Sequence, residues 1–159
     1  MIISVWITTL LLIISPSEPN LTHAEIDETL AVHNEWRAQV NVLPLVWDEE
    51  LSKIALKWAK QLKKEGCEFK HSGVNGLGEN LFMGTTGYYG PAEVVNSWGN
   101  EIKDYNYDKN SCSGVCGHYT QIVWKTTERV GCAKIECDGM DIWVCNYDPP
   151  GNWVGQKPY

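Results

Sequence analysis

The sequence predicts an α+β domain that is stapled by disulfide bonds. Apolar residues between Leu51 and Leu62 recur with the spacing of one helical face. Near the C-terminus, an Asp-Gly turn signal joins two segments that look like strands. The chain contains six cysteines, and an even number suits disulfides formed in an oxidising compartment.

The N-terminus predicts export of the chain. Residues 1–14 are almost wholly apolar and carry no charged side chain, and polar residues break the run from Ser15 onward. Such a run is too short to span a bilayer comfortably but fits a secretory signal peptide. We expect the signal peptide over residues 1–17, with cleavage after Ala24 and an uncleaved anchor as alternatives. A single domain over residues 25–159 follows.

The composition excludes one class of partner. Hydrophobic residues make up 43% of the chain, which indicates a globular protein instead of a disordered one. The net charge is −7 at pH 7, whereas unspecific nucleic-acid binding needs a basic surface. We therefore expect no nucleic-acid partner. We also expect a monomer that is not an integral membrane protein once the signal is cleaved.

Two helices are predicted in the first half of the domain. The first covers about residues 25–40, where the string His33–Arg37 is rich in polar groups for a core face. Pro44 prevents this helix from continuing through the next segment. The second helix begins after Asp48, a good N-cap, and ends at Gly66.

A third helix is predicted to begin at Pro91, which suits a first helical turn. Its buried side consists of Val94, Val95, Trp98 and Ile102. Glu101 falls on the same face, where a carboxylate costs free energy unless it is paired or hydrogen-bonded. It therefore needs a partner such as a histidine or a metal ion. The alternative is that Glu101 lies at the margin of the face and reaches solvent.

The remaining segments are predicted to be loops and a hairpin. Four glycines exclude a long helix over Cys67–Leu81, and Gly84–Gly90 is expected to be an exposed loop. Strands are expected over Arg129–Cys137 and Asp141–Tyr147, around the Asp-Gly turn. A bridge between the cysteines of the two strands, Cys132 and Cys145, would staple this hairpin. Cys112 and Cys116 are close enough for a small disulfide loop, which we prefer to a zinc pair because no matching second pair follows.

The string CGHYTQIVW, from Cys116 to Trp124, indicates a preorganised site. It places His118 between a possible disulfide and an apolar, core-like run. The alternative is a hydrogen-bonded core histidine. His71, Glu79 and Glu101 are three further titratable residues beside glycines or on an apolar face. If the four converge, imidazole and carboxylate together suit Zn or a similar divalent ion, or general acid–base chemistry.

The strings GHYTQIVW, VGCA and VCNYDPPGNWVGQKPY resemble the CAP superfamily of cysteine-rich secretory proteins, antigen 5 and pathogenesis-related class 1 proteins. They are most similar to the pathogenesis-related class 1 branch and to secreted bacterial proteins like it. HNEWR, PLVWDEEL, KHSG, GENL and WGNEIKDYNYDKNSC match that branch in order, so the resemblance covers Leu30 to Tyr159. It implies a three-layer α-β-α sandwich around a small, mainly antiparallel sheet.

The resemblance also implies a site and a disulfide pattern. The cleft tetrad of the family corresponds to His71, Glu79, Glu101 and His118. The two histidines correspond to the family's occasional ligands of divalent metals, such as Zn, and no cofactor is obligatory. The implied disulfides are Cys67–Cys137, Cys112–Cys116 and Cys132–Cys145.

We therefore predict a secreted, extracellular and non-enzymatic protein of defence or host–environment type that binds lipid or sterol. In relatives, the sterol region is the loop before GHYTQ, where Tyr105 and Tyr107 would provide apolar contacts here. One alternative is a metal-dependent, peptidase-like hydrolase that uses the tetrad, although the chain has no HExxH, no GxSxG and no cysteine left over if all six pair. Another is a precursor that releases Pro149–Tyr159 as a signalling peptide.

Overall fold

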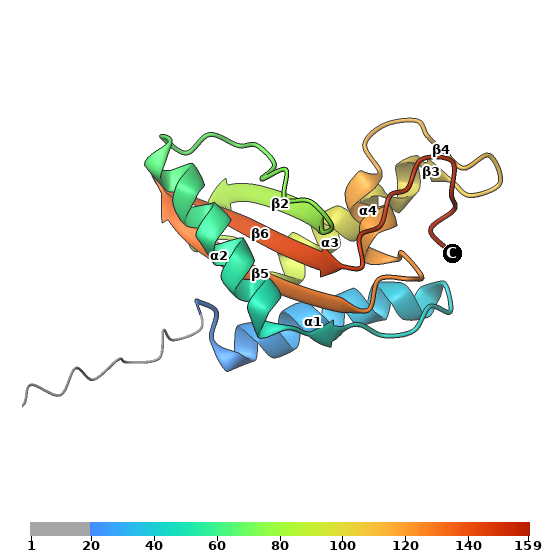
Figure 1. The fold of residues 1–159 in the computed structure, drawn as a ribbon, viewed down its shortest axis with the longest axis horizontal. Helices are drawn as coiled ribbons and strands as arrows, with labels where there is room; N and C mark the ends of the chain where they lie inside the picture. Colours follow the sequence, from blue (N-terminus) through green and yellow to red (C-terminus); the bar gives the residue numbers. More distant parts are fainter. Residues whose placement is uncertain (1–19) are drawn as a thin grey trace, which may run out of the picture.

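A four-stranded sheet forms the centre of the structure, with the strand order β1-β5-β6-β2 (Figure 1). The computed structural model describes residues 20–159. The strands of this sheet are β1 (Val46–Trp47), β2 (Gly78–Thr85), β5 (Arg129–Cys137) and β6 (Met140–Asp148). Strand β1 pairs parallel to β5, whereas the other two pairings are antiparallel. The mainly antiparallel sheet that we predicted is therefore confirmed.

Helices cover both faces of the sheet. Helix α2 (Glu49–Lys64) packs on one face, against β5 and β6 (Figure 1). The other face is covered by α1 (His23–Gln39), α3 (Pro91–Gly99) and the short α4 (Gly117–Ile122). A 3-10 turn, η1 (Asn100–Asp104), and a small hairpin of β3 (Tyr105–Asn106) and β4 (Ser111–Cys112) connect α3 to α4. The predicted α-β-α sandwich is confirmed.

The central strand β6 is buried on both faces because helices cover it from each side. Trp143, Cys145 and Tyr147 face the core shared with α1, α3 and α4. Ile142 and Val144 face the core shared with α2. All five are at most 1% exposed. Successive side chains of β6 point to opposite faces of the sheet, so this one strand packs against both layers of helices.

The second helix and the hairpin follow the sequence prediction closely. The Asp48 side chain caps α2 by accepting hydrogen bonds from the backbone N–H groups of Glu50 and Leu51, at 2.8 and 3.1 Å. In the turn between β5 and β6, Asp138 and Gly139 have φ angles of 52° and 78°. Positive φ at both central residues is what a tight two-residue hairpin turn requires.

All three implied disulfides are present, namely Cys67–Cys137, Cys112–Cys116 and Cys132–Cys145. Cys132 and Cys145 lie directly opposite each other in the β5–β6 register, so their bridge staples the hairpin as expected. The Cys67–Cys137 bridge ties the segment after α2 to the end of β5. Every cysteine of the chain is therefore paired.

Several elements differ from the prediction. Strand β2 occupies segments that we expected to be loops, because β6 pairs with it over its whole length, from Gly78↔Tyr147 to Thr85↔Met140. The parallel strand β1 and helix α4 were also not predicted. Ile102 was expected to be buried but is 38% exposed, since α3 ends at Gly99 and the chain continues as a 3-10 turn with a different period.

The predicted signal peptide over residues 1–17 lies outside the described residues. At the start of the described chain, Leu21 is only 1% exposed, and Thr22 forms a capping box with Glu25 at the beginning of α1. Cleavage after Ala24 would remove both of these contacts. Within residues 20–159, no helix has the length and apolar character needed to cross a membrane.

Arg37 is a buried cation at the C-terminal end of α1, with 1% of its surface exposed. Its guanidinium donates four hydrogen bonds to backbone carbonyls. The acceptors are Leu43 at 2.6 Å, Ile122 at 2.8 Å, Trp124 at 2.9 Å and Thr127 at 2.8 Å. Burial lowers the pKa of Arg37 to about 10, so the side chain still carries its charge at neutral pH.

His33 is the second buried polar group of α1, with no exposed surface. Its Nδ1 lies 2.7 Å from the carbonyl oxygen of Thr29, which can only accept, so Nδ1 carries the proton. Nε2 therefore accepts from the hydroxyl of Tyr147 at 2.9 Å, and that hydroxyl accepts from Nδ2 of Asn80 at 3.2 Å. The same Nδ2 lies 3.1 Å from the carbonyl of His118, so this network joins α1, β6, β2 and α4.

Burial lowers the pKa of His33 from 6.5 to about 4, which predicts acid destabilisation. Between these values the unfolded chain binds a proton that the folded chain does not, so the free energy of unfolding falls as pH drops from 6.5 to about 4. The loss should be roughly 3 kcal/mol for this residue. Urea unfolding at a series of pH values measures it. His33→Gln should show a shallower fall than wild type, whereas the exposed control His23→Gln should match wild type. Parallel profiles for wild type and His33→Gln would refute the assignment.

Candidate functional site

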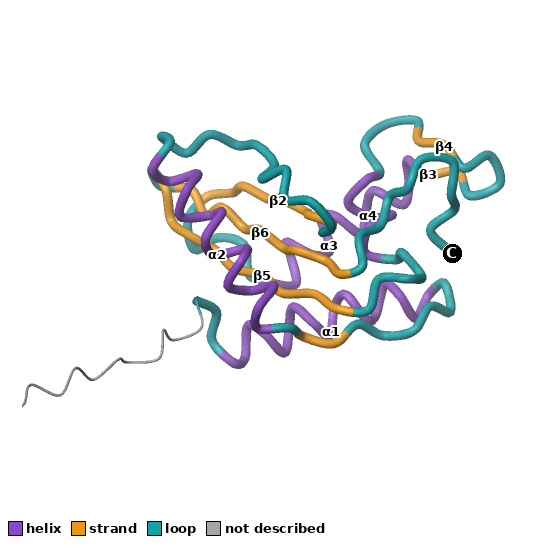
Figure 2. Tube along the Cα trace, in the orientation of Figure 1, coloured by secondary structure: helices purple, strands orange, loops and turns teal. Residues whose placement is uncertain are grey.

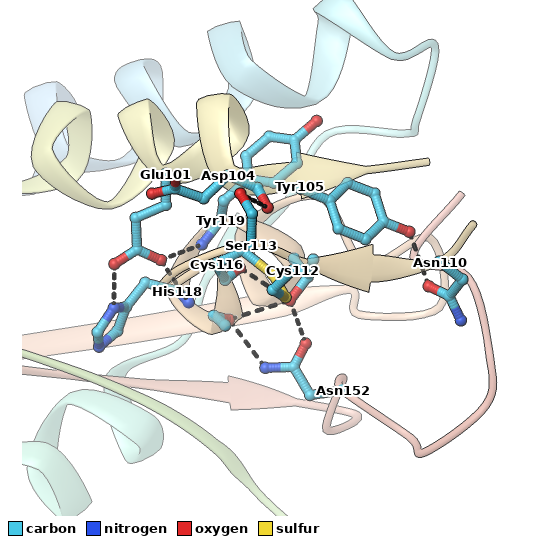
Figure 3. The surroundings of a disulfide bond; sticks show 12 residues. Glu101, Asp104, Tyr105, Asn110, Cys112, Ser113, Cys116, His118, Tyr119 and Asn152 are labelled. Atoms are coloured by element: carbon cyan, nitrogen blue, oxygen red, sulfur yellow. Dashed lines mark hydrogen bonds and ion pairs between the residues drawn. A yellow bond between two sulfur atoms is a disulfide. The ribbon is translucent and has the colours of Figure 1, made fainter. Parts of the chain in front are cut away.

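His118 stands in the first turn of α4 and is paired with Glu101 of η1 (Figure 3). Oε1 of Glu101 lies 2.6 Å from Nδ1 of His118. Oε2 accepts from the backbone N–H groups of His118 and Tyr119, at 3.0 and 3.3 Å. The predicted need of Glu101 for a partner is therefore met by the histidine ring and by the beginning of α4.

The second pair consists of His71, in the loop after α2, and Glu79 of β2. Oε1 of Glu79 lies 2.7 Å from Nδ1 of His71 and accepts from the backbone N–H of Ser72 at 2.9 Å. The Glu79 side chain is 7% exposed and the His71 side chain is 62% exposed. Oε2 of Glu79 is buried and finds no hydrogen-bond partner among residues 20–159.

These contacts shift the pKa values of the second pair in opposite directions. The hydrogen bond to Glu79 raises the pKa of His71, because the carboxylate favours the charged imidazolium. Burial by itself would raise the pKa of Glu79, but the hydrogen bonds from His71 and Ser72 outweigh it, so this pKa is lowered. Glu79 is therefore an ionised carboxylate at neutral pH.

Strand β2 brings the two pairs to the same end of the sheet. Glu79 contacts His71, and the next residue, Asn80, donates its side-chain N–H to the backbone carbonyl of His118. A Cβ on Gly78 would lie 2.1 Å from Oε1 of Gln121, so glycine allows β2 to approach α4 this closely. The four residues of the tetrad thus form two His–Glu pairs. They do not form a cluster of three or more His, Cys, Asp or Glu side chains that could hold a metal as they stand, and the rest of the described chain contains no such cluster.

Each pair leaves one imidazole nitrogen available. A neutral histidine that donates from Nδ1 to a carboxylate keeps a lone pair on Nε2, and the carboxylate fixes both the tautomer and the ring orientation. Within residues 20–159, neither His71 nor His118 uses Nε2 in a hydrogen bond. Trp98 orients His118 further, since its ring stacks on the imidazole at a centroid distance of 6.2 Å and an angle of 21°.

Asn80 and Trp98 are supporting residues that sequence reasoning missed. Asn80 is 1% exposed, and its position in the GENL string, next to a tetrad glutamate, was the available signal. Trp98 was expected only as a core residue, yet it both stacks on His118 and donates from Nε1 to the carbonyl of Leu81 at 3.0 Å. No pattern in the sequence distinguishes this second role from ordinary packing.

The two tyrosines predicted to contact lipid lie side by side but belong to different pockets. Their rings are arranged edge to face, with centroids 6.5 Å apart. Tyr105 donates its hydroxyl to Oδ1 of Asn110 at 2.8 Å. The Tyr107 ring stacks on the Tyr159 ring, with their centroids 4.7 Å apart. Tyr107 and Leu43 line a pocket of about 550 Å³, and Tyr105 does not line this pocket.

The C-terminal segment 149–159 runs along the β3–β4 hairpin (Figure 2). It is anchored at both ends: the backbone N–H of Gly151 donates to Oε1 of Gln121 at 2.9 Å, and the backbone N–H of Lys125 donates to the carbonyl of Pro158 at 2.7 Å. The Tyr159 hydroxyl and that of Tyr119 are also 3.0 Å apart. Pro158 is buried, so the segment is part of the packed domain.

The paired arrangement predicts how the pKa of His71 responds to a change in its partner. Glu79→Gln removes the carboxylate that stabilises the imidazolium, so the pKa of His71 should fall from its raised value toward or below its ordinary value of 6.5. NMR titration of the imidazole proton measures this. Glu68→Gln is the matched control, because Glu68 pairs with Lys70 and not with His71. An unchanged His71 pKa in Glu79→Gln would contradict the pairing.

Comparison with known proteins places the chain in a family. Residues 30–147 match the CAP family, described as the cysteine-rich secretory protein family. The chain is 51% identical to pathogenesis-related protein 1 of Arabidopsis thaliana over 128 residues, which cover 80% of this chain and 78% of that protein. It is 42% identical to pathogenesis-related protein 1C of Nicotiana tabacum over 156 residues, covering 96% and 92% of the two chains.

Comparison of the fold with solved structures agrees with the sequence comparison. The crystal structure of NaASP2 with Zn2+ is similar with a TM-score of 0.74 and 27% identity, covering 91% of this chain and 88% of that one. The sequence match and the shared sandwich therefore point to the same family. The chain belongs to the CAP family, and its domain is of the pathogenesis-related protein 1 type.

Proposed function

We propose that this chain is a secreted, non-enzymatic binding protein whose His71 and His118 hold a divalent cation, with Zn²⁺ as the first candidate. The observation that carries the proposal is that both histidines bind a carboxylate through Nδ1 and keep Nε2 free. This is the arrangement of carboxylate–histidine–metal sites, in which the carboxylate orients the ring and raises its basicity.

The two glutamates would play different parts. Both oxygens of Glu101 are already used, one by the His118 ring and the other by backbone N–H groups, so Glu101 is a positioning residue. Glu79 has a buried oxygen without a partner in the described chain and could supply a third, oxygen ligand. A nitrogen and oxygen donor set of this kind suits Zn²⁺. When bound, the ion would supply a positive charge and an open coordination position for a ligand.

The similarity to other proteins supports the same proposal. NaASP2, 27% identical to this chain, was crystallised with Zn2+. The relatives named pathogenesis-related protein 1 support an extracellular defence role, and three disulfides fit an oxidising compartment outside the cell. A hydrolase would cleave peptide substrates, whereas a protein that only binds would not. A peptidase assay with and without Zn²⁺ therefore distinguishes the hydrolase alternative.

Calorimetric titration with ZnCl₂ tests the cation site. The double variant His71→Ala, His118→Ala should lose binding, and Glu101→Gln should weaken it by roughly 10–100-fold because it only positions a ligand. Affinity should fall as the pH drops through about 6.5, since imidazole binds metal only when neutral. The raised pKa of His71 moves the onset of this loss to higher pH.

His23→Ala is the control for this titration, because His23 is exposed and lies at the start of α1, away from the tetrad. It should bind Zn²⁺ as wild type does. Equal affinity of wild type and the double variant would show that the tetrad is a hydrogen-bonded structural cluster and not a cation site.

A lipid or sterol is the second candidate ligand, and the pocket beside Tyr107 favours it. This pocket has a volume of about 550 Å³, which lies within the range of roughly 300–1,000 Å³ for small-molecule sites. It is lined by Val40, Asn41, Val42, Leu43, Tyr107, Lys125 and Tyr159. Leu43 is 80% exposed and lines this pocket, so its apolar side chain is accessible to a ligand.

Leu43→Asp should weaken the binding of a fluorescent sterol by about tenfold, because a charge at the mouth of the pocket would have to be desolvated. Fluorescence titration measures this. Val154→Asp introduces the same charge at a fully exposed residue outside the pocket and should have no effect. Equal affinity of the two variants would place the sterol elsewhere.

A further inference from the structure

The β3–β4 hairpin and the C-terminal segment 149–159 run side by side (Figures 1 and 2). Residues of both segments line a separate pocket. Its volume is about 280 Å³, and it shares no lining residue with the tetrad or with the pocket beside Tyr107. None of the described residues that line it is charged, although the chain has a net charge of −7. The pocket therefore offers nothing to pair with an ion, and its chemistry suits a neutral ligand.

Trp153 forms the rim of this pocket and is held in place while remaining 56% exposed. Its Nε1 donates to the carbonyl of Pro150 at 3.1 Å. Its own carbonyl accepts from the N–H of Gln156 at 3.0 Å, and Gly155 has a φ of 80°, as the third residue of a type II turn requires. An exposed indole that is already ordered loses little entropy when it binds a ligand.

The rest of the lining includes a tyrosine and two amides that lie around the Cys112–Cys116 disulfide (Figure 3). Asn110 accepts from the Tyr105 hydroxyl at 2.8 Å and donates to the carbonyl of Gln156 at 3.0 Å, so it ties this part of the lining to the tail. Asn152 is fixed by hydrogen bonds to Thr120 and Gly117 in the first turn of α4, at 2.6 and 2.9 Å. Each amide group has two N–H donors and uses one, so each keeps a donor for a ligand.

From these features we propose that the pocket binds one ring of a neutral saccharide. An aromatic ring can pack against the apolar C–H face of a pyranose, while amide groups bond its hydroxyls. The groups that would do so are Tyr105, Asn110, Trp124, Asn152, Trp153 and Gln156. The volume of about 280 Å³ is close to half that of the pocket beside Tyr107, which suits a single hydroxylated ring better than a ligand of sterol size.

The test uses the full secreted chain and three neutral oligosaccharides, namely laminarihexaose, cellohexaose and chitohexaose, with hexagalacturonate as the charged comparison. Binding is followed by tryptophan fluorescence and by saturation-transfer NMR. At least one neutral oligosaccharide should bind, and Trp153→Ala should weaken its binding by about tenfold or more, because the variant loses the aromatic ring against which the sugar packs. Gln156→Ala keeps the backbone of the turn and should weaken binding less.

Val154→Ala is the matched control, because Val154 lies in the same turn, is fully exposed and does not line the pocket. It should bind saccharide as wild type does, and circular dichroism should show the same fold for all variants. The proposal is wrong if none of the neutral oligosaccharides binds, if hexagalacturonate binds equally well, or if Trp153→Ala matches Val154→Ala. It is also wrong if Trp153→Ala weakens sterol binding while no saccharide binds, since the pocket would then belong to the lipid site.

Discussion

The buried guanidinium of Arg37 is the interaction on which much of the structure depends. It donates to carbonyls in the loop after α1, at the end of α4 and in the turn before β5. A planar guanidinium can reach several carbonyls at fixed angles, whereas a lysine ammonium could not serve all of them. Without it, buried carbonyls would lose their donors, at a cost of roughly 1–3 kcal/mol for each. Because Ile122 is the last residue of α4, Arg37 fixes the far end of the helix whose first turn carries His118.

A second buried network connects the fold to the site. His33, Tyr147 and Asn80 form a chain of hydrogen bonds from α1 through the centre of the sheet to the backbone of His118. Each member has a partner on both sides, so the network is satisfied even though it is buried. The backbone of His118 is therefore held by groups that also hold the helices to the sheet. This is why a change in the core, such as loss of His33, should also be felt at the site.

The sequence allowed the prediction of elements whose signals are local. The period of α2, the Asp48 cap and the Asp-Gly turn each depend on neighbours in the chain, and each was predicted correctly. Strand β2 was missed because its extended form comes from pairing with β6, more than fifty residues away, while its own glycines resemble a loop. The pairing of Glu101 was predicted from a continued α-helix, but the residue lies in a 3-10 turn. The prediction held because the reason for it, an acid facing the core, did not depend on the exact period.

The candidate site also has residues that the sequence predicted and residues that it did not. The four tetrad residues could be named from the sequence and its family resemblance, and the structure brings them together as two pairs. Their supporting contacts depend on the fold: Asn80 and Trp98 reach His118 across the domain, and the backbone N–H of Ser72 donates to Glu79 because β2 lies beside the loop after α2. The neutral pocket could also not be predicted from the sequence, since its lining comes from segments as far apart as the β3–β4 hairpin and the C-terminal tail. Sequence patterns identify the reactive groups, while the packing of distant segments decides what supports them.

The proposed cation site requires that the free Nε2 atoms of His71 and His118 are metal ligands. Anomalous diffraction at the zinc edge, from crystals grown with Zn²⁺, tests it most directly because it locates the ion itself. We expect a peak about 2.0–2.1 Å from Nε2 of both histidines, with Glu79 close enough to supply an oxygen. Zinc bound at Nδ1, or bound elsewhere while both His–Glu pairs stay intact, would contradict it.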